Sequence, residues 1–214
     1  MRGNRAGLMG HSMNDICSFL TPYGTVLDIG CGGGRHLIYL KERGLNVMGI
    51  DISCERLRKA KPAIEVIQAD AHHLPLEANS VDCILCSEVL EHLADPNKCI
   101  EEVKRVLKNG GIACFTTPCL NIPIPAIVPI YRKLIGVNPE SAKEHLRVFS
   151  DIDLINMLRR SFTIADVKYT NFTTIIDRTL GVGYSLDQPI SNITKKVSML
   201  HYLAASVWVK CVNE

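Results

Sequence analysis

The sequence lacks a long apolar run, a strong net charge and an apolar leader. No stretch reaches the roughly 18–20 consecutive apolar residues that a membrane-spanning helix requires, so we expect no transmembrane segment. The first residues, MRGNRAGLMGHSMN, hold no apolar core, so no signal peptide is expected either. The formal net charge is only +2, with no long run of one sign, which argues against a nucleic-acid partner.

The cysteines also lack the arrangement of a structural metal site. There are nine, an odd number, at irregular spacing. Cys83 and Cys86 form a CxxC, but a zinc site needs a second such pair and the sequence has none. Because most of the cysteines lie among apolar residues, we expect reduced, buried thiols in a cytoplasmic protein.

Apolar runs rich in Val and Ile are present instead, and they alternate with helical patterns. Continuous runs of this kind are typical of strands buried on both faces. The helical patterns end at Gly and Pro positions and begin behind residues that cap helices well. We expect strands at 25–30, 46–51, 64–69, 81–87, 111–117, 162–169 and 205–212, and helices at 34–43, 53–61, 96–107 and about 150–160.

This alternation predicts an α/β fold, a Rossmann-like doubly wound sheet with its ligand crevice at the carboxyl ends of the strands. The length of 214 residues suits one domain over 1–214. Two long connections, at about 119–149 and 171–203, interrupt the alternation of strands and helices, and we interpret them as insertions. Long connections in a compact domain usually carry function.

Four glycines fall within five positions directly after the first predicted strand. A glycine turn between a strand and a helix presents backbone N–H groups to a polar or anionic ligand. The dinucleotide pattern G-x-G-x-x-G is not met, because Arg35 stands at the third glycine position. A nicotinamide cofactor is therefore disfavoured. The observed pattern is Gly30-x-Gly32-x-Gly34, preceded by Asp28.

The stretch DIGCGGG, residues 28–34, resembles the first motif of the class I S-adenosylmethionine-dependent methyltransferases. EVLEHL and EHLRVFS narrow the resemblance toward the methyltransferase domain 11-like subgroup that contains ubiquinone-biosynthesis O-methyltransferases. It covers about residues 20–118. It implies S-adenosyl-L-methionine as cofactor, with contacts at Asp28, Gly30, Gly32 and Gly34. It also implies a seven-stranded sheet in the order 3-2-1-4-5-7-6, mostly parallel with an antiparallel last strand.

The resemblance assigns further cofactor contacts to the end of the second strand. Asp51 is expected to accept hydrogen bonds from both ribose hydroxyls. The alternative for Asp51 is a cap on the following helix. Ile52 would pack on the face of the adenine.

The ends of the third and fourth strands carry the remaining expected contacts. In the resembling family, Asp70 and the backbone of Ala71 would read the adenine amino group, although Asp70 also suits a plain turn. We expect His72 and His73, which follow, to be solvent-facing loop residues. Ser87 lies where the family's fourth motif lines the methyl-transfer site, and we count it among the cofactor contacts.

Glu88, Glu91 and His92 are spaced i, i+3 and i+4, so one helical turn would place them on one side. Three interpretations stay open: local packing and capping, acid–base or acceptor contact, or a divalent metal held with a further histidine such as His145. The metal pattern resembles that of small-RNA 2′-O-methyltransferases. We predict no metal, and we take Glu91, His92 and His145 as catalytic candidates.

The insertion at 119–149 is rich in isoleucine and proline. It suits a lid packed on the domain, an apolar acceptor channel or a weak membrane-surface contact. We therefore expect a methyltransferase that acts by in-line displacement on a small-molecule or lipid-like acceptor. The alternative is a non-catalytic regulatory protein that binds S-adenosylmethionine.

Overall fold

The computed structural model describes residues 13–60, 64–119, 146–147, 149–170 and 206–214. The predicted strands and helices all occur there, with ends shifted by a few residues. Most of both predicted insertions lies outside these ranges, so a single domain over 1–214 with two insertions stays a prediction. The elements are α1 (Met13–Leu20), β1 (Thr25–Ile29), α2 (Arg35–Lys41), β2 (Asn46–Asp51), α3 (Cys54–Leu57), β3 (Glu65–Gln68), β4 (Val81–Ser87), η1 (Leu90–His92), α4 (Pro96–Val106), β5 (Leu107–Pro118), α7 (Asp151–Leu158), β6 (Thr163–Thr170) and β7 (Ser206–Val212).

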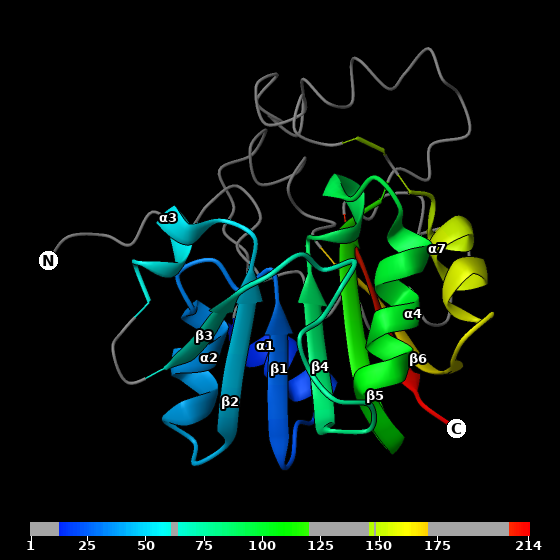
Figure 1. Cartoon of the computed structure of the whole chain (residues 1–214). Helices are drawn as coiled ribbons and strands as arrows, with labels where there is room; N and C mark the ends of the chain where they lie inside the picture. The colour runs from blue at the N-terminus through cyan, green and yellow to red at the C-terminus, as the bar shows by residue number, and fades with distance from the viewer. Residues whose placement is uncertain (1–12, 61–63, 120–145, 148, 171–205) are drawn as a thin grey trace, which may run out of the picture.

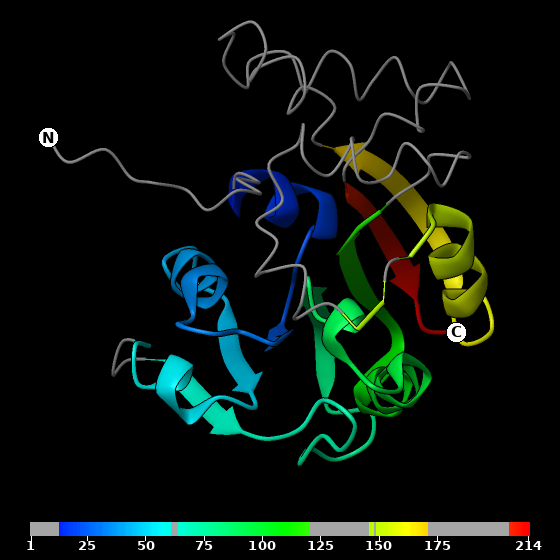
Figure 2. The same cartoon turned by 90° about the horizontal axis from the view of Figure 1, so that it is seen from above.

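The strands form one seven-stranded sheet in the order β3-β2-β1-β4-β5-β7-β6 (Figure 1). Strand β1 pairs in parallel with β2 on one side and with β4 on the other. Strand β7 runs antiparallel to both of its neighbours, β5 and β6. The predicted fold class and strand order are confirmed. Seen from above, β6 and β7 lie side by side at the end of the sheet far from β3 (Figure 2).

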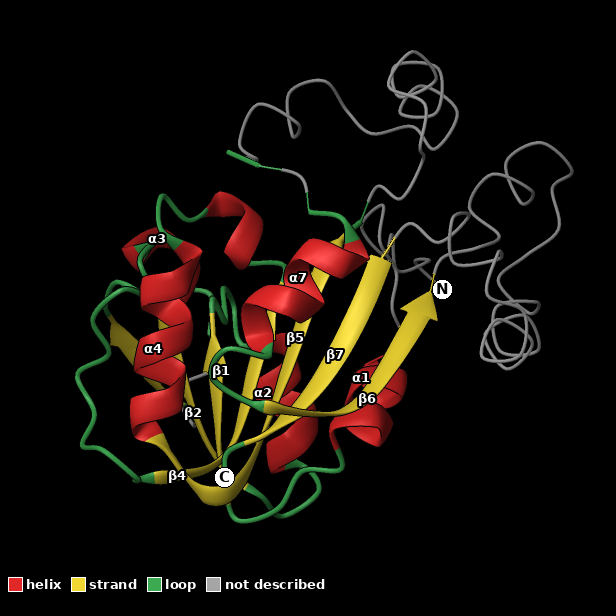
Figure 3. Cartoon of the chain, turned by 90° about the vertical axis from the view of Figure 1, so that its right-hand side faces the viewer, coloured by secondary structure: helices red, strands yellow, loops and turns green. Residues whose placement is uncertain are grey.

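Helices cover both faces of the sheet, with α4 and α7 on one side and α1 and α2 on the other (Figure 3). Alternate side chains of one strand therefore enter different cores. Leu27 and Ile29 pack with the α4 and α7 side, whereas Val26, which precedes them on the same strand, packs with α2. No helix in the described ranges is both long and apolar enough to cross a membrane.

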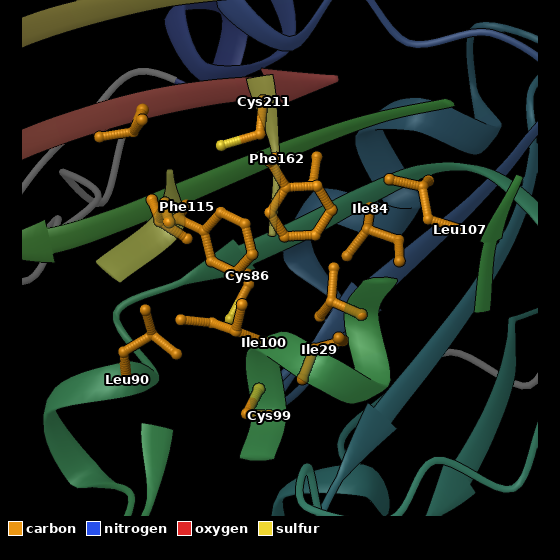
Figure 4. Close-up of a cluster of buried hydrophobic side chains, with 14 of the residues drawn as sticks. Ile29, Ile84, Cys86, Leu90, Cys99, Ile100, Leu107, Phe115, Phe162 and Cys211 are labelled. Atoms are coloured by element: carbon orange, nitrogen blue, oxygen red, sulfur yellow. The ribbon is translucent and has the colours of Figure 1, made fainter. Parts of the chain in front are cut away.

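The larger core joins β4 and β5 to α4 and to the segment before β6 (Figure 4). The ring centroids of Phe115 and Phe162 lie 6.1 Å apart, and Cys86 and Ile100 belong to the same cluster. All nine cysteines are free thiols, and eight of them are buried, as predicted; only Cys54 is exposed. This packed core supports the end of β4, which Glu88 and Glu91 follow.

Helix α1 was not anticipated from the sequence. Its buried side chains Ile16 and Leu20 pack against Leu85, Cys114 and Trp208, on the face of the sheet that α1 and α2 cover. The helix spans only 8 residues, and a piece this short is marginal by itself. Burial against the sheet stabilises α1, and local pattern alone does not reveal that contact.

The junction between α4 and β5 also differs from the prediction. The predicted helix ends at 107 and the predicted strand begins at 111, which leaves a short turn between them, but the strand already begins at Leu107. Leu107 pairs with Val81, and the register then shifts before the next pair. Gly110 has φ +75°, a backbone conformation that glycine adopts without steric cost. The expected turn is therefore an irregularity inside the strand.

Candidate functional site

A cavity of about 410 Å³ opens at the carboxyl ends of β1, β2, β3 and β4, the upper edge of the sheet in Figure 1. This is where a doubly wound sheet is expected to bind its ligand. Its volume falls within the range that small-molecule sites have. The lining residues are Ile29, Gly30, Ile50, Asp51, Ile52, Ser53, Arg56, Ala69, Asp70, Ala71, His72, Glu88, Val89, His92, Leu93 and Ala94.

The glycine turn between β1 and α2 lies beside this cavity. Gly30 has φ +73°, and a Cβ there would overlap Cγ2 of Val89 on the facing segment. Gly32 has φ +52°, but in contrast to Gly30 no atom lies within 4 Å of the position that a Cβ would take. The turn therefore presents open space next to a backbone N–H. Gly34 is the left-handed N-cap of α2, and neither it nor Gly32 lines the cavity.

The carboxylate of Asp51 is fixed by backbone donors at the end of β2. Its Oδ2 atom accepts a hydrogen bond from Gly32 N at 2.8 Å, and its Oδ1 atom accepts one from Ser53 N at 2.8 Å. Only 4% of Asp51 is exposed, yet it lines the cavity. The cap of α3 is Ser53, whose hydroxyl accepts from Arg56 N. The helix-cap alternative for Asp51 is therefore wrong.

Asp28 lies beneath the glycine turn and does not line the cavity. It is almost fully buried, and its Oδ2 atom lies 3.4 Å from Nδ1 of His36 without hydrogen-bond geometry. Burial lowers the pKa of His36, but the interaction with Asp28 outweighs it and raises the pKa overall. Asp28 is thus a buried carboxylate beside His36 of α2, and its predicted direct cofactor contact stays a prediction.

The part of the cavity that follows β2 and β3 holds three of the predicted cofactor-contact residues. Ile52 lines it with 68% of its surface exposed, an apolar side chain with no partner of its own. Asp70 and Ala71 line the same region. Donation from the backbone N–H of His72, together with its ring, lowers the pKa of Asp70 against the opposing effect of burial.

The other side of the cavity begins where β4 ends. Ser87 shares a hydrogen bond with the Thr116 hydroxyl at 2.9 Å and is not a lining residue, so its cofactor contact stays a prediction. Glu88 lines the cavity with φ +55°, a left-handed conformation that is strained for a residue with a side chain. Its Oε1 atom accepts from Thr116 Oγ1 at 3.2 Å. Burial, with the neighbouring charge of Glu91, raises the pKa of Glu88 to about 8.

The expectation that Glu88, Glu91 and His92 share one face of a helical turn is wrong. Glu88 precedes the turn, which is the three-residue 3₁₀ helix η1. Glu88 and His92 line the cavity, whereas Glu91 is 1% exposed and accepts from Thr117 Oγ1 at 3.1 Å. Its main-chain oxygen accepts from the N–H groups of the 146–147 segment. These contacts fit the packing interpretation of Glu91, and a catalytic role for it stays a prediction.

The match to a protein-family model falls on this part of the chain. Residues 27–115 match the family described as a methyltransferase domain. They hold the glycine turn, the cavity-lining strand ends and both acidic positions after β4. Over these residues the chain is similar to a methyltransferase domain. The family resemblance predicted from DIGCGGG is confirmed.

Two curated proteins illustrate the relatives to which the chain is similar. The malonyl-[acyl-carrier protein] O-methyltransferase of Salmonella typhimurium is 33% identical over 119 residues, 53% of this chain and 47% of that protein. The ubiquinone biosynthesis O-methyltransferase of Aliivibrio fischeri is 31% identical over 143 residues, 62% of this chain and 61% of that protein. The chain thus spans about half to three fifths of the length of these relatives.

A solved structure of geranyl diphosphate methyltransferase in complex with SAM superimposes with a TM-score of 0.67. The identity is 16%, and the match covers 94% of this chain and 84% of that one. At this identity the likeness concerns the fold alone.

Several residues that line the cavity were not predicted as site residues. His72 was expected to face solvent, but its side chain is only 17% exposed and it lines the cavity; His73 is exposed as expected. Arg56 lines the cavity from α3, two positions after the first helical residue. Leu93 and Ala94 complete the wall after η1. No motif marks these positions, because the two walls meet only in the folded chain.

Within the described residues, no three His, Cys, Asp or Glu side chains are arranged to hold a metal ion. His145, the further ligand of the metal interpretation, lies outside those residues. The same holds for His145 as a catalytic candidate. Of the two catalytic candidates within the described residues, Glu91 and His92, only His92 lines the cavity.

Proposed function

We propose that the protein transfers a methyl group from S-adenosyl-L-methionine to an oxygen nucleophile of a small-molecule or lipid-like acceptor. The observation that carries this proposal is the Asp51 carboxylate, held by Gly32 N and Ser53 N at the edge of the cavity. A buried carboxylate that is fixed in this way is ready to accept hydrogen bonds from a ribose diol without reorganising.

The described residues fit this cofactor. The Cβ of any other residue at position 32 would enter the open space beside the turn, so a bare backbone suits a ligand that approaches closely. The exposed apolar surface of Ile52 offers a face for a purine ring. Asp70 and the backbone of Ala71 offer polar contacts to the edge of the base. The charged and apolar groups therefore match a nucleoside from sugar to base.

The acceptor side of the cavity is assigned to Glu88 and His92. When bound, the cofactor supplies a methyl group that its positive sulfur already activates. The protein then has to hold the acceptor oxygen in line and exclude water. A hydroxyl acceptor must also lose its proton, and His92, which lines the cavity, is the proposed base that receives it.

The names of the two relatives support an oxygen acceptor, since both are O-methyltransferases. The names of the two relatives give different acceptors, so they support O-methylation without indicating a particular acceptor for this chain. A regulatory protein that binds the cofactor without turnover is not favoured, because titratable side chains remain at the acceptor side of the cavity.

Calorimetry and turnover test the proposal in two steps. Titration with S-adenosylmethionine and S-adenosylhomocysteine should give saturable heat, and a lack of heat from both on folded protein would refute the cofactor assignment. Release of S-adenosylhomocysteine should then be measured with a panel of phenolic, quinol and carboxylate acceptors. His92→Asn should lower kcat with hydroxyl acceptors about 10²-fold or more, as loss of a general base does, while cofactor affinity is kept. Tight binding without turnover across the panel would restore the regulatory alternative.

A further inference from the structure

His72 joins the two walls of the cavity through both of its ring nitrogens. Its Nδ1 atom lies 2.6 Å from Oδ1 of Asp70, and its Nε2 atom accepts a hydrogen bond from Asp95 N at 3.3 Å. The backbone N–H of His72 donates to the same Oδ1 atom of Asp70 at 2.9 Å. One side chain thus connects the segment after β3 to the segment after η1.

The two contacts fix the protonation state of the ring. A backbone N–H can only donate, so Nε2 must accept and carry no proton. In a neutral imidazole the other nitrogen is then the donor. The proton therefore sits on Nδ1, which donates to Asp70. The neutral Nδ1–H form satisfies both partners at once, and no other form does.

The two connected segments both line the cavity. Asp70 and Ala71 belong to the segment after β3, and Leu93 and Ala94 belong to the segment after η1. Asp95 is the N-cap of α4, and its carboxylate accepts from the N–H groups at the start of that helix. His72 thus ties the base-facing segment to the beginning of α4, whose buried face packs into the larger core.

The far end of the same segment has an anchor of its own. Glu102 accepts from Leu74 N at 2.7 Å, and Arg105 donates to the main-chain oxygens of Leu74 and Leu76. These contacts lie outside the cavity lining. Among the described residues, His72 makes the corresponding tie at the cavity itself. Removing it would free the cavity end of the segment while the far end stays attached.

We propose that His72 is a positioning residue that sets the orientation of Asp70 toward the base of the cofactor. His72 directs its backbone N–H and its Nδ1–H at Oδ1 of Asp70, which leaves Oδ2 for the ligand. The contact between its Nε2 atom and Asp95 N holds this arrangement against the start of α4. The inference rests on the proposed function, because it assigns Asp70 to the amino group of an adenine. His72 itself needs no contact with the reacting atoms.

Base selectivity tests this role. S-adenosylhomocysteine and S-inosylhomocysteine differ at the position where adenine carries its amino group, so their dissociation constants report on Asp70. The wild-type protein should prefer the adenine ligand. In His72→Phe, which keeps a ring of similar size, that preference should shrink about five- to tenfold, the effect of losing one hydrogen bond. His72→Asn keeps a donor near Nδ1 and should lose about two- to threefold. The matched control is His73→Phe, an exposed neighbour, and it should keep the wild-type preference.

Two readouts need no ligand. Amide exchange of Asp95 N–H should be faster in both His72 variants than in the wild type and in His73→Phe. The ¹⁵N shifts of His72 should identify the Nδ1–H tautomer. A full adenine preference in folded His72→Phe would overturn the proposal, and so would slow exchange at Asp95 in that variant. If the wild type binds neither ligand, the proposed function falls and with it the role of His72, while the exchange data still decide whether the bridge exists.

Discussion

Asp51 and Glu88 both lie at the end of a strand beside the cavity, but their hydrogen-bonding environments differ. Asp51 ends β2 and Glu88 follows β4, and both carboxylates line the same cavity. Asp51 is held by two backbone N–H groups. Glu88 has a hydroxyl partner in Thr116, and burial with the charge of Glu91 raises its pKa to about 8. One side of the cavity offers a fixed acceptor, and the other offers a group that titrates near neutral pH.

The difference follows from where the partners come from. The donors to Asp51 are Gly32, in the adjacent turn, and Ser53, two residues along the chain. The neighbours of Glu88 include Thr116 on β5 and Ser206 on β7, far away in the sequence. A local motif can encode the first environment, whereas the second exists only after the sheet has assembled. Four substitutions would break or sharpen this comparison.

The largest effect should come from Gly32→Val. The new side chain would enter the open space beside the turn and disturb the N–H that holds Asp51. Calorimetry should show a loss of S-adenosylhomocysteine affinity of more than about a hundredfold, or roughly 2.7 kcal/mol. Gly44→Val is the matched control, since Gly44 also has a positive φ and open space around it but is remote from the cavity. Equal affinity loss in both variants would mean that backbone strain alone is responsible.

Asp51→Ala should have the next largest effect. Charge-assisted hydrogen bonds to two hydroxyls contribute about 1.5–3 kcal/mol, so the dissociation constant should rise about 10- to 150-fold. The control is Asp82→Ala, which removes a carboxylate that accepts from Thr25 N and pairs with Lys108 away from the cavity. An unchanged dissociation constant in Asp51→Ala would remove the observation on which the proposed function rests.

Ile52→Ala should weaken cofactor binding more modestly. The loss of apolar contact with a purine corresponds to about 1 kcal/mol, or roughly fivefold in the dissociation constant. Stability should hardly change, because Ile52 is 68% exposed without a ligand. Ile152→Ala, at a 62% exposed position on α7, is the control and should leave binding unaltered. A thermal melt with and without S-adenosylhomocysteine would separate the two effects.

Glu88→Gln should have the smallest effect on cofactor affinity, and its main effect concerns stability against pH. The folded-state pKa of about 8 exceeds the ordinary value of 4.5. Between these values the folded chain keeps a proton that the unfolded chain has released, so the free energy of unfolding falls as pH rises through the window. Urea unfolding from about pH 5 to about pH 8 should show a shallower fall in Glu88→Gln, because glutamine does not titrate. Part of the slope should remain, since burial also raises the pKa of Glu91. An identical slope in the wild type and in Glu88→Gln would mean that groups other than Glu88 titrate in this pH range.

The sequence predicted the fold more completely than the site. Continuous apolar runs marked each strand, and Ser53, Asp95 and Ser150 all cap helices close to the predicted starts. It did not predict α1, whose short pattern gains stability only against Trp208 and its neighbours. It also misjudged the turn after β4, where spacing suggested an α-helical face and the chain forms a 3₁₀ turn behind a left-handed Glu88.

The sequence by itself determined the parallel sheet, the bare turn after β1 and the carboxylate that faces it. These depend on apolar periodicity and on neighbours close along the chain. Only the tertiary structure decided that Glu91 turns inward to Thr117, that Glu88 is buried enough to hold a proton, and that His72 reaches Asp95. Burial and hydrogen bonding between distant segments set those properties, and no local pattern records which segments will meet.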